Sequence, residues 1–133
     1  MTEPGGFHRV RYTGAPVRMP VGLHVEKDAM RLTFTDALDK AGAADAANYA
    51  VQQWNYRWTS DYGSKNYSVE NPSKQGVDDV EVAGVTVSDD GRSVTLKIPG
   101  LKPVMQMKIQ VNLKAADGQP VKHAIHNTVN RVP

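Results

Sequence analysis

Residues 103–114, PVMQMKIQVNLK, decide the fold of this chain. Apolar and polar side chains alternate through the segment, and the apolar series consists of Met105, Met107, Ile109, Val111 and Leu113. A period of two places successive side chains on opposite faces of a strand, so one face is predicted to be buried and the other to face solvent. Strands of this kind build antiparallel sheets, and the segment therefore predicts a β domain.

The turn after this strand selects its partner. The sequence KAADGQPV, which ends at Val121, allows a two-residue Asp117-Gly118 turn or a three-residue loop that begins at Ala116. Only the three-residue loop places Leu113 opposite Val121 and keeps apolar residues facing each other. We therefore predict the three-residue loop, with Gly118 in the left-handed conformation that such loops need.

A second hairpin is predicted at VSDDGRSV. A two-residue Asp90-Gly91 turn pairs Val87 with Val94 and continues the apolar pairing upstream, whereas a three-residue loop breaks it. The sequence therefore predicts a tight type I′ turn.

The other apolar stretches are short and are separated by turn residues. They are VGLHVE at 21–26, MRLTFT at 30–35, YAVQQWNYRW at 49–58, VDDVEVAGVTVS at 77–88, RSVTLKIP at 92–99 and PVKHAIHNTVNRV at 120–132. About seven such strands predict an all-β, two-sheet sandwich of the immunoglobulin-like or fibronectin III-like kind with one long loop insertion. We assign the sandwich to residues 21–133 and an N-terminal linker or edge segment to residues 1–20.

One segment favours helix. DALDKAGAADAANY, residues 36–49, is rich in alanine, and Asp45 could cap a single turn. Gly42 and the short length limit the helix to a turn or two.

Composition excludes several classes of function. The 133 residues carry 16 basic and 14 acidic side chains, a net charge of +2, which is too balanced to indicate nucleic acid as a partner. The chain has no cysteine, which excludes thiol catalysis and cysteine metal sites. No apolar run is long enough to insert into a membrane. MTEPGGFHRV lacks the apolar core of a signal peptide, so the chain is either cytoplasmic or a segment of a longer protein, and we favour the second.

No pattern indicates catalysis or a cofactor. His123 and His126 form an H-x-x-H pair, but residues three apart on a strand point to opposite faces, so we predict no metal site. Adjacent carboxylates at Asp78-Asp79 and Asp89-Asp90 diverge and make poor acid/base pairs. We predict a non-catalytic domain without a bound cofactor.

The aromatic residues concentrate in WNYRWTSDYGSKNY, residues 54–67. Trp54, Tyr56 and Trp58 share one strand face, and we expect Trp54 and Tyr56 in the core and Trp58 partly buried. The polar connection at 59–76 is long enough to indicate binding or docking. The candidate contact residues for a ligand or partner are Arg57, Trp58, Asp61, Tyr62, Asn66 and Tyr67.

The order of turn motifs resembles a known class of module. The order of strands and turns over residues 21–130 is similar to that of bacterial immunoglobulin-like or fibronectin-like modules. The segments that carry this similarity are MRLTFTDALDKAGAADAANYAV, VTVSDDGRSVTLKIPGL and IQVNLKAADGQPV. The chain further resembles the sandwich segment of large secreted proteins with sorbosone-dehydrogenase-like propeller and cytochrome c domains. The stretches that carry this resemblance are GFHRVRYTG, PVGLHV, AVQQWNYRW and PVMQMKIQVNLKAADG. The resemblance carries no catalytic residue to this chain, and the absence of cysteine excludes a heme-attachment motif within it.

Three functions remain open. The first is a non-catalytic accessory or interdomain module of a larger secreted bacterial protein, located extracellularly or in the periplasm, with neighbouring domains of the same polypeptide as partners. The alternative is a carbohydrate-binding module that uses the Trp54–Tyr67 region, with rings stacked on sugars. A small enzyme or metal protein ranks last.

Overall fold

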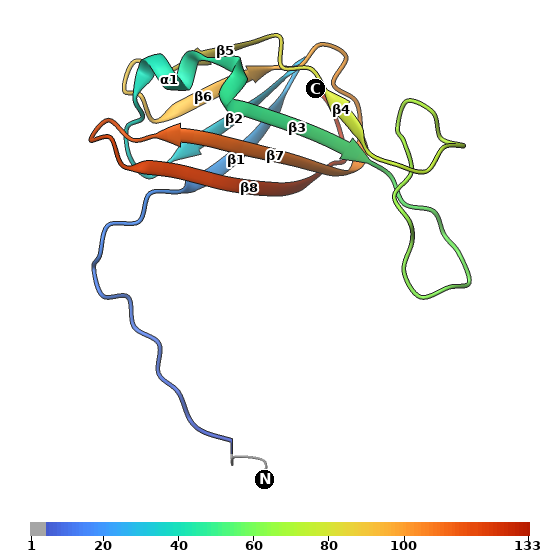
Figure 1. Cartoon of the computed structure of the whole chain (residues 1–133), viewed down its shortest axis with the longest axis horizontal. Helices are drawn as coiled ribbons and strands as arrows, with labels where there is room; N and C mark the ends of the chain where they lie inside the picture. The colour runs from blue at the N-terminus through green and yellow to red at the C-terminus, as the bar shows by residue number, and fades with distance from the viewer. Residues whose placement is uncertain (1–4) are drawn as a thin grey trace.

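A computed structural model describes residues 5–133 and shows a sandwich of two four-stranded antiparallel sheets in that part of the chain (Figure 1). The first sheet has the order β1 (Pro20–Glu26), β2 (Ala29–Phe34), β6 (Ser93–Lys97), β5 (Gly84–Val87). The second has the order β4 (Asp78–Val80), β3 (Tyr49–Trp54), β7 (Val104–Lys114), β8 (Pro120–Val129). The predicted all-β sandwich is confirmed, and the strand order is that of immunoglobulin strands ABED and CFG with β4 added beside the third strand.

The core lies between the two sheets. Both sheets contribute apolar side chains with no exposed surface, namely Met30, Leu32, Val94, Leu96, Met107 and Ile109. Each alternates with more exposed neighbours along its strand, as expected for sheets that bury one face.

The β7–β8 hairpin has the predicted register. Leu113 faces Val121, Val111 faces His123, and Ile109 faces Ile125. The backbone of Ala115 donates to the Gln119 carbonyl at 2.8 Å and closes a loop of residues 116–118, in which Gly118 has a φ of +85°. The three-residue loop is therefore confirmed.

Gly118→Ala is expected to lower the free energy of unfolding by about 1–2 kcal/mol, because a Cβ disfavours the left-handed conformation. The matched control is Gly84→Ala in β5, where the backbone is not left-handed and an added Cβ meets no atom within 4 Å. Urea denaturation of both variants measures the difference. Equal midpoints would contradict the assigned loop conformation.

The β5–β6 hairpin keeps the predicted pairing of Val87 with Val94, but the predicted type I′ turn is wrong. Ser88 and Ser93 close the loop, so residues 89–92 all lie within it, and among them only Gly91 has a positive φ. Loops of two and four residues give the same register, so the apolar pattern cannot distinguish them. Contacts with another segment accompany the longer loop, since the Gly91 and Arg92 carbonyls accept from the backbone of Leu38 and Phe34.

The helical segment is short, as predicted. It forms α1 (Lys40–Ala44) and the 3-10 turn η1 (Ala46–Asn48). Asp39 accepts from the Gly42 amide at 3.0 Å, and Asp45 accepts from the Ala47 amide at 2.9 Å. Asp45 is thus the cap of a single turn, and Asp39 caps the turn before it.

The prediction that Trp54 and Tyr56 belong to the core is wrong. The inward positions of β3 are Tyr49, Val51 and Gln53, so Trp54 lies on the outer face of its sheet. There it is half-buried and packs edge-to-face on His126, with ring centroids 6.4 Å apart. The strand ends at Trp54, and Tyr56 is 42% exposed beyond it.

The segment before β1, residues 5–19, forms no strand and extends away from the sandwich (Figure 1). Its last residues are attached to the β7–β8 hairpin, because Arg18 pairs with Asp117 and the Arg18 carbonyl lies 3.0 Å from His123 Nε2. Whether residues 1–20 act as a linker stays a prediction. Within residues 5–133, no helix has the length and apolar character needed to cross a membrane.

Candidate docking surface

The connection between β3 and β4, residues 55–77, projects from one end of the sandwich (Figure 1), and we call it the 55–77 loop. Asn55 and Tyr67 exchange two backbone hydrogen bonds of 2.8 and 2.9 Å, and Tyr67 also bridges to Gln75. These pairings divide the loop into a first lobe at 56–66 and a second lobe at 68–76. The loop is therefore folded on itself rather than extended.

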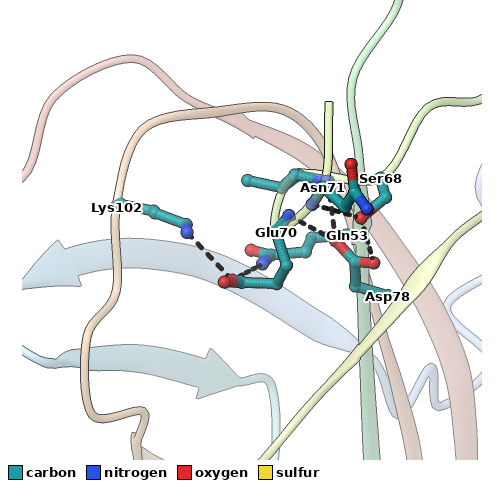
Figure 2. Close-up of polar contacts among 7 residues, drawn as sticks. Gln53, Ser68, Glu70, Asn71, Asp78 and Lys102 are labelled. Carbon is teal, nitrogen blue, oxygen red and sulfur yellow. Dashed lines mark hydrogen bonds and ion pairs between the residues drawn. The ribbon is translucent and has the colours of Figure 1, made fainter. Parts of the chain in front are cut away.

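Asp78, the first residue of β4, holds the start of the second lobe (Figure 2). Its carboxylate accepts from Ser68 Oγ at 2.6 Å and from the amides of Val69 and Glu70 at 2.6 and 3.0 Å. Ser68 Oγ in turn accepts from the Asn71 amide at 2.8 Å. One carboxylate thus organises the backbone of a turn eight to ten residues before it.

Desolvation alone would raise the pKa of Asp78. The hydrogen bonds from Ser68 and from the Glu70 and Val69 amides oppose this effect, as does the positive charge of Lys102. The net result is a pKa below the ordinary value for aspartate, because the donors stabilise the charged form. Asp78 is therefore an ionised structural anchor at neutral pH.

Glu70 connects the second lobe to the rest of the domain (Figure 2). Its Oε1 lies 2.9 Å from Lys102 Nζ and accepts from Gln53 Nε2 at 3.4 Å. Gln53 is buried on the inner face of β3, and Lys102 lies in the connection between β6 and β7. The lobe is thus held from two separate segments of the sandwich.

Arg57 joins the two lobes. Its guanidinium stacks over the ring of Tyr67, 4.1 Å from the centroid, and also donates to the Pro72 carbonyl. The Arg57 amide donates to Ser64 Oγ at 2.9 Å. Arg57 and Tyr67, which the sequence places among the contact residues, therefore serve first to hold the loop together.

Trp58 and Tyr62 are the exposed aromatic residues of the first lobe. Their relative exposures are 101% and 109%, so neither ring rests on the domain, and the expectation that Trp58 is partly buried is wrong. Asp61 and Asn66 are also exposed. The first lobe therefore presents two large, fully exposed aromatic side chains on a loop whose base is hydrogen-bonded to the domain.

A cleft of about 410 Å³ lies in the loop. It is lined by Thr59, Asp61, Tyr62, Gly63, Ser64, Lys65, Tyr67 and Gln75. The cleft brings together three of the predicted contact residues, Asp61, Tyr62 and Tyr67, whereas Arg57, Trp58 and Asn66 do not line it. Sequence reasoning missed Asp78, because nothing in its local sequence shows that its carboxylate bonds to the segment at 68–70.

The histidines lie as predicted, with His123 half-buried on the inner face of β8 and His126 exposed on the outer face. Within residues 5–133 no cluster of three or more His, Asp or Glu side chains has a metal-binding arrangement.

No protein-family model matches the chain, and no curated protein matches it. Among solved structures, the crystal structure of CopC from Methylosinus trichosporium OB3b is similar to it with a TM-score of 0.46. The two sequences are 15% identical, and the match covers 86% of this chain and 94% of CopC. No residue role is carried over from CopC, and the β-sandwich assignment is based on the strand pairing of this chain itself.

Proposed function

We propose that this domain is a non-catalytic accessory or interdomain module of a larger secreted bacterial protein, extracellular or periplasmic. The 55–77 loop is its contact surface for a neighbouring domain of the same polypeptide, and the segment that precedes β1 serves as the linker. The observation that carries the proposal is the full exposure of Trp58 and Tyr62 on a loop whose base is hydrogen-bonded to Asp78.

The loop is preorganised for docking. Tryptophan and tyrosine are enriched among the residues that contribute most to binding energy. They make this contribution when a partner buries their rings. A loop that is already held by Asp78, Glu70 and Arg57 loses little conformational entropy when it docks. Exposed polar residues of the same lobe, such as Asp61 and Asn66, supply the polar rim typical of such contacts.

Carbohydrate binding by the Trp54–Tyr67 region is the second candidate. The cleft lined by Tyr62, Tyr67, Asp61 and Lys65 supports it, because it combines aromatic rings with hydrogen-bonding groups. The placement of Trp54 beside His126, on the outer face of the sheet, separates it from that cleft and weakens the candidate.

Hydrogen exchange separates the two candidates. In the full-length product of the gene, we expect backbone amides at 57–65 to exchange more slowly than in the isolated 133-residue chain. Amides of β7 should exchange alike in both and serve as the internal control. Identical exchange at 57–65 would contradict docking, and glycan-induced NMR shifts at Tyr62 and Tyr67 in the isolated chain would favour the second candidate.

Trp58→Ala and Tyr62→Ala are expected to change the free energy of unfolding of the isolated chain by no more than about 0.5 kcal/mol, because both rings are exposed. In the full-length protein the same variants should remove the slow exchange at 57–65. The matched control is Val21→Ala, which truncates an exposed apolar side chain on β1. If Val21→Ala has the same effect on the loop, the contact surface is assigned wrongly.

A further inference from the structure

The outer face of the β4-β3-β7-β8 sheet carries an ordered set of polar side chains. Strand register places Gln52, Lys108 and His126 in one cross-strand row. The next row is Ala50, Gln110 and Ala124, and the one beyond it pairs Asn112 with Lys122. Rows on the same face recur about every 6.6–6.8 Å along the strands. We call these side chains the outer-face rows.

The middle row is hollowed. Ala50 and Ala124 are short side chains on either side of Gln110, and a cavity of about 450 Å³ lies over them. Asn48, Asn112 and Lys122 also line this hollow. It is an open depression over the sheet whose surface is mostly apolar, and its polar groups include Gln110, Asn112 and Lys122. It lies away from the 55–77 loop, none of whose residues line it.

The charge of the outer-face rows is one-sided. Lys108 and Lys122 have no carboxylate within ion-pairing distance in residues 5–133, where the ion pairs are Arg18–Asp117, Arg31–Glu26 and Lys102–Glu70. Two acids lie at the margins of the face: Asp79 accepts from Gln52 at 3.0 Å, and Asp39 lines a neighbouring cavity together with Asn112 and Lys122. No acidic side chain lines the hollow. The face is therefore complementary to an anion.

The hollow also offers amide groups for hydrogen bonds. Asn48 donates one bond to the Gly42 carbonyl, while the side chains of Gln110 and Asn112 have no protein partner within residues 5–133. An amide presents both a donor and an acceptor, which matches a hydroxyl that can do the same. Several amides beside a lysine thus fit a ligand that combines hydroxyl groups with a negative charge.

We propose that the hollow in the outer face of this sheet binds an acidic oligosaccharide, with the hydroxyl groups paired to Gln110 and Asn112 and the carboxylate of a uronic acid paired to Lys122. The site is separate from the 55–77 loop, so it stands whether or not that loop docks to a neighbouring domain. Nucleic acid fits less well, because the net charge of the chain is only +2 and the tryptophan of this sheet is half-buried against His126.

NMR titration of the complete 133-residue chain with short uronate oligomers tests the proposal. The probes are oligogalacturonate, oligomannuronate and a hyaluronan oligosaccharide, each compared with its methyl-esterified form. We expect at least one acid form to shift the amides of Ala50, Gln110 and Ala124, and its ester to bind about tenfold more weakly or worse, because a charged hydrogen bond is lost. The proposal is overturned if no acid form binds, if the ester binds equally well, or if single-stranded DNA of equal charge binds as tightly as the best acid form.

Two variants locate the site. Lys122→Gln should weaken binding of the acid form about tenfold and leave the weak affinity for the ester unchanged, whereas Gln110→Ala should weaken both. Lys97→Gln, on the opposite sheet, is the matched control for charge. Equal losses in Lys122→Gln and Lys97→Gln would show that net charge alone attracts the ligand and would refute the assigned site.

Discussion

Met107→Ala is expected to lower the free energy of unfolding by about 2–5 kcal/mol, the usual cost of truncating a fully buried large side chain. Met107 has no exposed surface and lies on the inner face of β7, between the two sheets. Truncation removes its packing contacts and leaves a cavity that rigid strands on both sides cannot close. Chemical denaturation followed by circular dichroism measures the loss.

Met105→Ala is the matched control, two positions earlier on the same strand. Met105 is 50% exposed, so its truncation should change the free energy of unfolding by no more than about 0.5 kcal/mol. The alternation of PVMQMKIQVNLK assigns both methionines to one buried face. Similar losses for the two variants would therefore support the simple alternation and contradict the structure.

Asp78→Ala is expected to lower the free energy of unfolding by about 2–3 kcal/mol, because it removes a charged acceptor shared by three donors. Native-state hydrogen exchange should also show faster exchange of the Val69 and Glu70 amides. Asp79→Ala is the control, since that neighbouring carboxylate accepts one bond from Gln52. An Asp78→Ala variant as stable as Asp79→Ala would show that the carboxylate does not hold the loop.

The effect of Asp78→Ala should depend on pH in one direction. Because the pKa of Asp78 is lowered in the folded state, its stabilisation is present above the unfolded pKa of about 4. It is lost as the pH falls through the depressed folded pKa, where both states become protonated. The stability difference between wild type and Asp78→Ala should thus be constant above about pH 5 and shrink below about pH 4. A difference that grows on acidification would refute this assignment.

The candidate contact residues could be predicted from the sequence only in part. The sequence alone places Trp58, Asp61, Tyr62 and Asn66 in a long polar connection, and the structure shows all of them exposed there. It does not distinguish them from Arg57, which stacks on Tyr67 inside the loop. Whether a side chain of the loop is exposed or packs inside it depends on contacts between the two lobes, such as that of Arg57 with Tyr67. No local sequence pattern encodes these contacts. The rows of amides and lysines on the outer face likewise come from strands far apart in the chain.

The sequence by itself determined the features that depend on neighbouring residues. Alternation with a period of two predicts the strands, and the loop lengths compatible with apolar pairing predict the register at Leu113–Val121 and Val87–Val94. Asp45 caps its turn through an amide only two residues away. Each of these is a local interaction, so the residues that decide it lie close together in the chain.

Only the tertiary structure decided the features that depend on distant partners. A register irregularity between Val104 and Met107, opposite β8, turns Met105 outward and buries Val104. In β3, Tyr49 and Val51 are buried between the sheets, and alternation along the strand then places Trp54 on the outer face. Trp54 lies outside although its ring is larger than that of Tyr49. In both cases the free energy depends on how a whole strand packs against others far away in sequence, and side-chain size or alternation within one segment does not report that packing.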